Sequence, residues 1–570
     1  MNRLLAALVL VLIGLGAVQP ARGEPMIGLG TLRTDGKYAN SSVTGISANG
    51  LTIVGSSGIN QDPDEFGNDQ SSDRAFVWTA TETGGTMLGL GTLRTDSSGF
   101  SRAKFVSADG SRVVCDSIND QDNPEACVWK SGEGIVGLGT LKAEGFSYSV
   151  ANGVSANGNR VVGESLNDQD MPEAFVCTLG EEGWQMVGLG TLRDDRSSGY
   201  SVAMGVSADG SMIVGYSEND NGITEACVWK NVVEEGWRAF GLGTLRQDEF
   251  EQFAGYSVAT GISADGSTII GYSGNSMDSP EAFVTTAVEG QFSRIIALGM
   301  LRTDGGCSFS FPICISANGL TIAGYSERYI PHINETEEVV FADAFAEACV
   351  WKKPVEGDWQ LVGLGTLGTG GGKSSFAKSI TADGTMIVGD SFGDEDAPKA
   401  FVCTAVDGVF GRMVGQGWLR TDGTYAYSAA AVISADGSRI VGQTYTDQGF
   451  FGAFLREPVV EEDTTPPTIS VTANPNSIWP PNNKMVPVTL AVTATDDSGV
   501  VPTWRIVSVS CNEETEFGDI EITGRLTLNL RATRLGTGTG RVYSITVRCT
   551  DASENVTDAV VTVTVSHDQD

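Results

Sequence analysis

Acidic side chains recur at one spacing in this 570-residue chain. Two copies of Asn-Asp-x-Asp, each followed by a glutamate, supply the side-chain oxygens of Asp120, Asp122, Glu125, Asp168, Asp170 and Glu173. Clustered carboxylates suit hard cations such as Ca²⁺. The spacing lacks the twelve-residue loop and terminal glutamate of an EF-hand, so these residues are candidates for a structural calcium site of another kind. The alternative is ordinary acidic loops, and no other cofactor is expected.

Composition excludes several kinds of chemistry. His332 and His567 are the only histidines and lie far apart in the sequence, which argues against Ser–His catalysis and histidine-rich zinc sites. The formal charge of −35 argues against nucleic-acid binding, because phosphate backbones need a basic face.

The elements that must position any site come from an internal repeat. Variants of GLGTL begin at Gly28, Gly89, Gly137, Gly188, Gly241, Ala297, Gly363 and Gly415. Between them stands S-A-[DN]-G or TADG, then a β-rich hexad such as MIVGYS (212–217) and a segment such as EACVW (225–229). Asp-Gly or Asn-Gly between apolar runs is a strong hairpin signal. Each unit therefore predicts four antiparallel strands, as in a propeller blade.

The two ends of the repeat region complement each other. After residue 23 the chain begins with a lone fourth strand, MIGLGTL (26–32), and the eighth unit stops after its third strand, GAFLRE (452–457). The N-terminal strand can therefore complete the last blade. We expect an eight-bladed β-propeller over residues 24–457 rather than an open solenoid.

Strand alternation places the longest loops on one face of this disc. A basic residue follows GLGTL in seven units, namely Arg33, Arg94, Lys142, Arg193, Arg246, Arg302 and Arg420, with Gly368 as the exception. Together with the acidic loops they form a charged ring. This ring is a candidate surface for a polar ligand such as a glycan; pairing between blades is the alternative.

The pattern GLGTL…[IV]-S-A-[DN]-G-x-x-[IV]-V-G-x-S…A-F-V-W resembles the HAF repeat of bacterial extracellular repeat proteins. The resemblance covers residues 28–456. It implies export and a cell-surface or extracellular setting, and it supplies no catalytic residues.

The N-terminal segment independently indicates export. In residues 1–23, Arg3 precedes an apolar run from Leu4 to Val18 that ends in small residues, which is the pattern of a secretory signal. The run is shorter than the ~20 residues that span a membrane. We expect a secreted or cell-surface protein with no membrane insertion after signal removal.

The C-terminal part has a different pattern. A Pro- and acid-rich linker, PVVEEDTTPP (458–467), precedes alternating Thr- and Val-rich runs such as RVYSITVRCTD (541–551). Period-two alternation predicts a β-sandwich over residues 468–570. It resembles the immunoglobulin-like modules that follow TTPP linkers on bacterial surface proteins, which implies a spacer or docking role. The whole chain is thus expected to be all-β.

Ten cysteines in an exported chain suggest disulfides. We predict a bridge between Cys511 and Cys549 in the sandwich, and a local one between Cys307 and Cys314. The other six occupy repeat positions and are expected to be buried free thiols, because equivalent positions in different blades lie too far apart. They are Cys115, Cys127, Cys177, Cys227, Cys349 and Cys403.

Three functions fit these features. The first is a non-catalytic interaction or adhesion protein that binds a glycan or surface protein through the loop face. The second is a secreted glycan-active hydrolase or lyase, with carboxylates or a Tyr–Arg pair at the axial mouth. The third is a structural surface or matrix component. Fold alone does not select among them, and the sequence assigns no catalytic residue.

Overall fold

The computed structural model describes residues 26–566 apart from 35–39, 60–72, 82–83, 195–198, 247–254, 278, 289, 302–307, 334–338, 369–372, 395–396, 407, 420–426, 458–464, 497–501, 537–539 and 552–554. The expected signal segment 1–23 and most of the linker lie outside the described residues. Every regular element within them is a strand, which confirms the all-β prediction. No helix there is long and apolar enough to cross a membrane.

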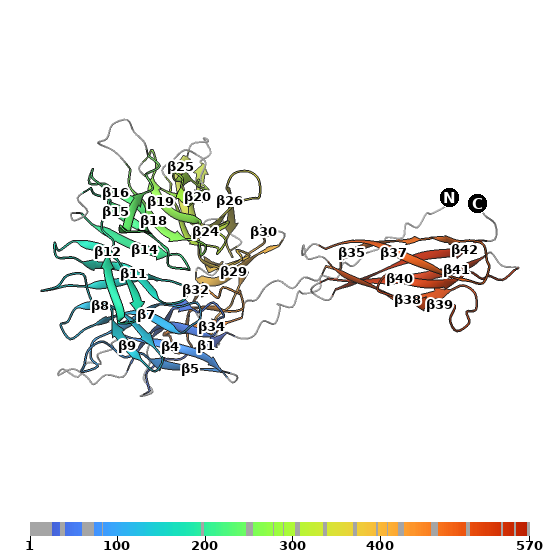
Figure 1. The fold of residues 1–570 in the computed structure, drawn as a ribbon, viewed down its shortest axis with the longest axis horizontal. Coiled ribbons are helices and arrows are strands. Elements are labelled where there is room, and N and C mark those ends of the chain that lie inside the picture. Colours follow the sequence, from blue (N-terminus) through green and yellow to red (C-terminus); the bar gives the residue numbers. More distant parts are fainter. Residues whose placement is uncertain are drawn as a thin grey trace, which may run out of the picture.

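The repeats form antiparallel sheets that are arranged as the blades of a propeller (Figure 1). Blade 1 comprises β2 (Ser41–Ile46), β3 (Thr52–Gly58), β4 (Asp73–Thr81) and β5 (Gly84–Gly89). Blade 2 comprises β6 (Ser101–Val106), β7 (Arg112–Ile118), β8 (Pro124–Lys130) and β9 (Gly134–Gly137). Blade 3 comprises β10 (Ser149–Val154), β11 (Arg160–Leu166), β12 (Pro172–Gly180) and β13 (Gly183–Gly188). Blade 4 comprises β14 (Ser201–Val206), β15 (Met212–Glu218), β16 (Thr224–Val232) and β17 (Gly236–Gly241).

The second half of the repeat region continues the series. Blade 5 comprises β18 (Ser257–Ile262), β19 (Thr268–Gly274), β20 (Pro280–Val288), β21 (Gln291–Phe292) and β22 (Ile296–Ala297). Blade 6 comprises β23 (Ser310–Ile315), β24 (Thr321–Ile333), β25 (Val339–Lys352) and β26 (Gln360–Gly365). Blade 7 comprises β27 (Ser375–Ile380), β28 (Met386–Phe392), β29 (Pro398–Val406), β30 (Val409–Phe410) and β31 (Val414–Gly415). Blade 8 comprises β32 (Ser428–Ile433), β33 (Ile440–Tyr445), β34 (Phe451–Arg456) and β1 (Ile27–Gly28).

The N-terminal strand closes the ring, as the sequence predicts. β1 pairs antiparallel with β34, with Ile27 opposite Leu455. One apolar cluster joins Val441 and Ala453 of blade 8 to Ile53 and Phe76 of blade 1. The two ends of the repeat region therefore form a single blade and pack against the first.

Two hydroxyl positions in each repeat connect neighbouring blades. The serine that opens each inner strand accepts a hydrogen bond of 2.8–3.0 Å from the N–H of an alanine in the third strand of the preceding blade, as Ser201 does from Ala174. The second strand of each blade carries a glycine, replaced by Cys115 in blade 2, and a hydroxyl residue stands two positions after it. This hydroxyl accepts a hydrogen bond of 2.9–3.4 Å from the N–H of the last leucine of GLGTL or its variant, as Ser217 does from Leu192. These bonds give the repeated serines and leucines a structural role.

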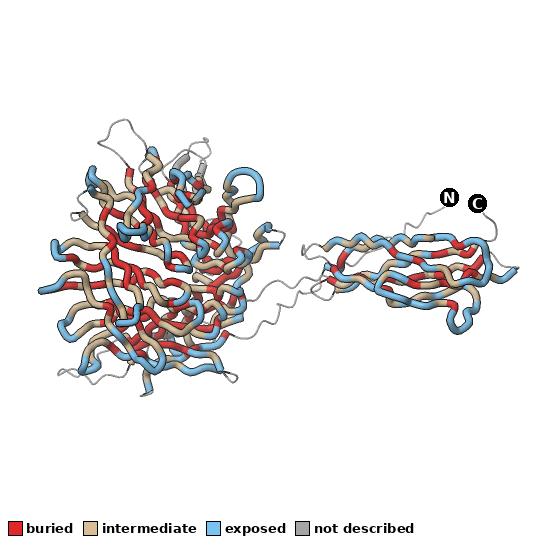
Figure 2. Tube along the Cα trace, viewed as in Figure 1, coloured by how far each residue is buried: buried red, intermediate tan, exposed pale blue. Residues whose placement is uncertain are grey.

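The buried residues lie in the central strands of each sheet (Figure 2), and their side chains pack against those of the neighbouring blade, so the hydrophobic core is a series of clusters between blades. Between blades 3 and 4, for example, Val176 and Leu189 pack against Ile213 and Trp229. Tight strand packing explains the recurring strand glycine: in the seven blades that have it, an added Cβ would lie 1.9–2.1 Å from a carbonyl oxygen of the inner strand.

The C-terminal region is a sandwich of two four-stranded sheets. One comprises β35 (Thr468–Asn474), β37 (Met485–Thr495), β40 (Thr527–Arg531) and β39 (Ile520–Ile522), and the other β36 (Ser477–Ile478), β42 (Val556–Val565), β41 (Arg541–Thr550) and β38 (Thr503–Cys511). Leu530, Tyr543 and Ile545 are fully buried between them. The buried Arg541 guanidinium lies 3.1 Å from both Glu513 and Asp519, which anchors the segment after β38.

Candidate functional site

The inner strands of all eight blades line an axial channel. At one end, here called the turn end, the S-A-[DN]-G and TADG hairpin turns surround a cavity of about 420 Å³. Its walls are the alanines of these turns and the Ile or Val residues that end the inner strands. Among the described residues, six hydrogen bonds of 2.9–3.0 Å connect the N–H of one turn alanine to the C=O of the next, as between Ala108 and Ala156. The turn end is therefore a hydrogen-bonded, mostly apolar ring.

The acidic residues of these turns are structural. The Ser107 hydroxyl donates to Asp109 Oδ1 over 2.6 Å, and the Ser111 N–H donates to the same oxygen over 3.0 Å. These hydrogen bonds hold the pKa of Asp109 below its ordinary value. Asn49 makes the equivalent contacts in blade 1 without a charge.

The opposite half of the channel, here called the variable end, differs from blade to blade. The position after the strand glycine, or after its replacement in blade 2, holds Ser56, Asp116, Glu164, Tyr216, Tyr272, Tyr325, Asp390 and Gln443. Each residue lies beside the first half of an inner strand, as Tyr216 lies opposite Val202. The repeat thus places different side chains at one level beside the inner strands.

An aromatic belt covers the variable end over blades 4–7. It consists of Tyr200, Tyr216, Tyr256, Tyr272, Phe309, Phe311, Tyr325 and Phe376, all partly exposed. Their rings contact one another within and between blades: the centroid of Tyr272 lies 5.0 Å from that of Phe311, and Tyr325 lies 5.1 Å from Phe376. Both contacts are edge-to-face, an arrangement that aromatic rings favour.

Charged residues adjoin the belt on blades 2 and 3. The Asp116 carboxylate lies 3.1 Å from Lys104 Nζ and accepts a hydrogen bond of 3.1 Å from the N–H of Ala151 in the next blade. Burial raises the pKa of Asp116, although the Lys104 ammonium acts in the opposite direction. Lys104 occupies the β-bulge of its inner strand and also lines a channel cavity of about 340 Å³.

Glu164 lies between this pair and the belt. Burial raises the pKa of its carboxyl group, with Lys104 again acting in the opposite direction. Burial and the nearby Glu164 carboxylate also raise the pKa of Tyr148 and Tyr216, so the carboxyl and the two phenols interact electrostatically. Perturbed groups that gather in a channel mark a candidate functional site.

The predicted calcium residues have protein partners. Asp120 Oδ1 accepts a hydrogen bond of 2.9 Å from the N–H of Thr95, and Asp122 pairs with Arg94. Glu125 accepts bonds of 2.8 Å from Gly139 N–H and from Asn119 Nδ2. Together they tie the acidic loop of blade 2 to adjacent turns.

Blade 3 repeats these contacts. Asp168 accepts from Ala143 over 3.1 Å, Asp170 pairs with Lys142, and Glu173 accepts from Gly190 over 3.1 Å. Across the described residues, no three His, Cys, Asp or Glu side chains form a group that could hold a metal ion.

The basic residues that follow GLGTL also have protein partners wherever the structure describes them. Besides Arg94 and Lys142, Arg193 lies 2.9 Å from Glu218. Arg33 and Arg246 also have interaction partners. Arg302 and Arg420 lie outside the described residues. The pairs connect loops of the same face, as the alternative interpretation predicts.

The structure does not bring together the predicted disulfide partners of the sandwich. Cys511 of β38 lies opposite Tyr543, whereas Cys549 of β41 lies opposite Trp504. From Tyr543 to Cys549 is six positions along β41, so at about 3.3 Å per residue the two cysteines are about 20 Å apart along the strands. Both thiols are free, and this prediction is corrected: the strands are neighbours, but their register separates the sulfurs. Cys307, the partner predicted for Cys314, lies outside the described residues.

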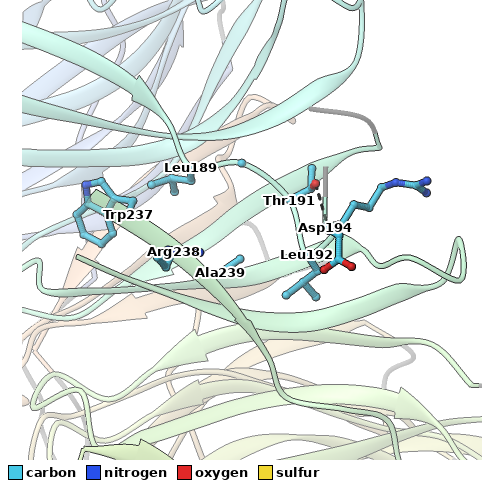
Figure 3. Close-up of a pocket in the computed structure, with 9 residues that line it drawn as sticks. Leu189, Thr191, Leu192, Asp194, Trp237, Arg238 and Ala239 are labelled. Carbon is cyan, nitrogen blue, oxygen red and sulfur yellow. Dashed lines mark hydrogen bonds between the residues drawn. The ribbon is translucent and has the colours of Figure 1, made fainter. Parts of the chain in front are cut away.

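A smaller pocket of about 210 Å³ lies near the outer strand of blade 4. Trp237 lies at one side, and Thr191 and Asp194 lie on the loop at the other (Figure 3). Much of its wall is the GLGTL segment that recurs in every unit. Its other lining residues are Arg193 and Asp194, which follow that segment, and three residues of β17 that include Trp237.

Sequence reasoning missed the aromatic belt and Glu164. The signal was present: within the recurring pattern [IVA]-[GC]-x-[ST], the residue x is in turn Ser, Asp, Glu, Tyr, Tyr, Tyr, Asp and Gln. Its importance depends on the ring, because only the closed propeller brings these positions to one level.

The fold and the channel define an all-β propeller protein with one asymmetric axial site. No family model and no curated protein matches the chain. Solved structures that are similar include TolB from Acinetobacter baumannii, 11% identical over 73% of this chain and 82% of that one, with a TM-score of 0.28. The β-propeller domain of the Trilobed protease from Pyrococcus furiosus is 10% identical over 64% and 95%, with a TM-score of 0.35. A post-proline cleaving enzyme from Rickettsia typhi is 8% identical over 67% and 56%, with a TM-score of 0.39.

Proposed function

We propose that the protein is an exported binding protein that holds a glycan at the variable end of its propeller channel. The observation that carries the proposal is the aromatic belt, in which Tyr and Phe rings remain partly exposed at the end of the channel where the blades differ. A protein interior would bury such rings completely, whereas a binding surface leaves part of them available.

The chemistry of the site favours sugars. Ring faces pack against the apolar C–H faces of pyranoses, and ligand sites combine such surfaces with a few convergent polar groups. Asp116, Glu164 and Lys104 supply these groups for sugar hydroxyls beside the belt. The formal charge of −35 disfavours polyanions, so the expected ligand is a neutral polysaccharide.

Export is part of this proposal. The apolar segment that begins at Leu4, with Arg3 before it and small residues after it, supports passage through a secretory route. The sandwich then acts as a spacer or docking module at the cell surface or in the medium. Such a location gives the channel access to polysaccharides outside the cell.

A retention experiment tests the proposal. The purified full chain is mixed with a panel of neutral insoluble polysaccharides, and bound protein and new reducing ends are followed together. We expect at least one polymer to retain the protein. Tyr272→Ala and Tyr325→Ala should each weaken the affinity about tenfold, which corresponds to a loss of about 1.4 kcal/mol of binding free energy for each ring removed. Phe517→Ala in the sandwich, where the ring is fully exposed, is the control and should bind as wild type. Equal retention of the belt variants would contradict the assignment.

A second candidate function is glycan cleavage at the same place. Glu164 favours it, because a carboxyl group whose pKa is raised by burial, beside the phenols of Tyr148 and Tyr216, is suited to act as a general acid. New reducing ends made by wild type and abolished by Glu164→Gln, with retention preserved, would establish this function. Retention without product supports the binding protein.

A further inference from the structure

Two thiols of blade 2 face each other across paired strands. Cys115 of β7 lies directly opposite Cys127 of β8, and both side chains are 0% exposed. Their Sγ atoms are 2.8 Å apart. Non-bonded carbon atoms prefer about 3.5–4.0 Å, and sulfur is the larger atom, so two thiols are crowded at this distance.

The other blades show that this pair is unusual. The position of Cys115 is glycine in the other seven blades, where a Cβ would meet an inner-strand carbonyl. The position of Cys127 is phenylalanine in five blades and cysteine in blades 4 and 6, as Cys227 and Cys349. Those two face Gly215 and Gly324. Blade 2 therefore combines both replacements, and the combination places two sulfurs in contact.

We propose that Cys115 and Cys127 form a disulfide within blade 2 of the exported protein. Residues directly opposite in an antiparallel pair have Cα atoms about 4.5–5.5 Å apart, within the range that disulfides span. Each thiol loses one hydrogen as the S–S bond forms. The two electrons and two protons pass to a disulfide oxidant of the export compartment, which is reduced to two thiols.

The bond has a consequence for the candidate site. Cys115 immediately precedes Asp116, whose carboxylate contacts Lys104 and Ala151. A covalent link from β7 to β8 fixes the strand that carries this carboxylate. Burial also raises the pKa of Cys127 well above the ordinary value of a thiol. Because thiolate is the reactive form, exchange is slow once the blade has folded, and the bond forms while the blade is open.

Alkylation mapping tests the proposal. The full chain is purified with reductant, partly unfolded in urea with a mixture of oxidised and reduced glutathione, refolded, then fully denatured and alkylated. Trypsin leaves both cysteines in the single peptide 113–130, after Arg112 and up to Lys130. We expect this peptide without alkyl groups and two hydrogens lighter, whereas Cys227 and Cys349 are alkylated. Alkylation of both blade 2 cysteines, or a bridge from Cys115 to any other cysteine, would overturn the proposal.

A double variant keeps the test independent of folding defects. Cys115→Gly with Cys127→Phe restores the pair found in five blades, as in Gly163 opposite Phe175. Reduction should lower the thermal midpoint of oxidised wild type by about 2–5 °C and leave that of the variant unchanged. The inference rests on the proposed export for its oxidant, but the glutathione reaction tests the bridge itself. A failure of export and a failure of the bridge are thus separate results.

Discussion

The two ends of the propeller channel are built from the same strands but follow opposite rules. At the turn end, hydrogen bonds between alanine backbones join neighbouring near-identical hairpins at six of the eight junctions, and polar side chains there bond to their own turn. At the variable end, one position passes through serine, aspartate, glutamate, tyrosine and glutamine. Residues that recur in every blade hold the ring together, whereas residues that differ between blades can build a single site.

The carboxylates of the two ends make the contrast physical. Hydrogen bonds lower the pKa of Asp109 at the turn end, so its charged form stabilises the fold. Burial raises the pKa of Asp116 and Glu164 at the variable end, so their charged forms oppose folding. Groups that reduce stability and gather beside exposed rings are typical of functional sites.

The largest expected effect is on stability, and it is seen by comparing substitutions at two adjacent residues of β15, Gly215 and Tyr216. Gly215→Ala should lower the free energy of unfolding by about 2–3 kcal/mol, because its Cβ would lie 2.0 Å from the carbonyl oxygen of Val202. Tyr216→Ser, which introduces the residue that blade 1 carries as Ser56, should cost about 1 kcal/mol or less. Urea unfolding of both variants measures the difference. Equal losses would mean that the variable end is as structural as the shared framework.

The next effect appears at low pH. In one variant, all five aspartates of the hairpin turns are replaced by asparagine, the residue that already occupies this position in blades 1, 3 and 6. The five aspartates are Asp109, Asp209, Asp265, Asp383 and Asp436. Their folded pKa values are lowered, so their stabilisation is present above the unfolded value of about 3.9 and is lost as the pH falls through the folded pKa. Below about pH 4 the thermal midpoint of wild type should fall several degrees more than that of the variant. Parallel curves between pH 7 and pH 2.5 would refute the structural role of these charges.

Glu164→Gln should act in the opposite direction and more weakly. The folded pKa of Glu164 is raised, so stability is lost as the pH rises from the unfolded value of about 4.3 through the folded pKa. The variant should melt about 1–2 °C higher than wild type at pH 7 and at the same temperature below pH 4. Glu125→Gln is the matched control: its carboxylate accepts bonds from Gly139 and Asn119, so the change should destabilise. A destabilised Glu164→Gln would remove the contrast between the ends.

The smallest expected effect concerns calcium. EDTA should leave the thermal midpoint unchanged, because Asp120, Asp122 and Glu125 are occupied by protein donors. A lowered midpoint that added Ca²⁺ restores would instead revive the calcium site suggested by the Asn-Asp-x-Asp spacing.

Much of the fold could be predicted because its signals are local and repeated. Asp-Gly and Asn-Gly turns fix the hairpins, and the incomplete first and last units predict that β1 joins β34. The sandwich shows where such reasoning stops. Alternation places Cys511 and Cys549 on neighbouring strands, but the register that separates them depends on loops and packing that alternation does not encode.

The candidate site was only partly predictable. The sequence points to the axial mouth only for the alternative, catalytic function, and it places the candidate binding residues in the charged loops, where the structure shows pairs such as Arg193 with Glu218. Cys115 and Cys127 occupy different positions of the repeat, and only the pairing of β7 with β8 places their sulfurs in contact.

The sequence by itself determined the strands, the repeat and the ends that complete one another, because turn chemistry and apolar periodicity act over a few residues. The tertiary structure alone decided which repeated positions meet. Closure of the ring sets residues some 50 positions apart in the chain side by side around one axis, as Ala108 bonds to Ala156. A site made of one residue per blade, such as Glu164 with Tyr216, exists only in that closed arrangement.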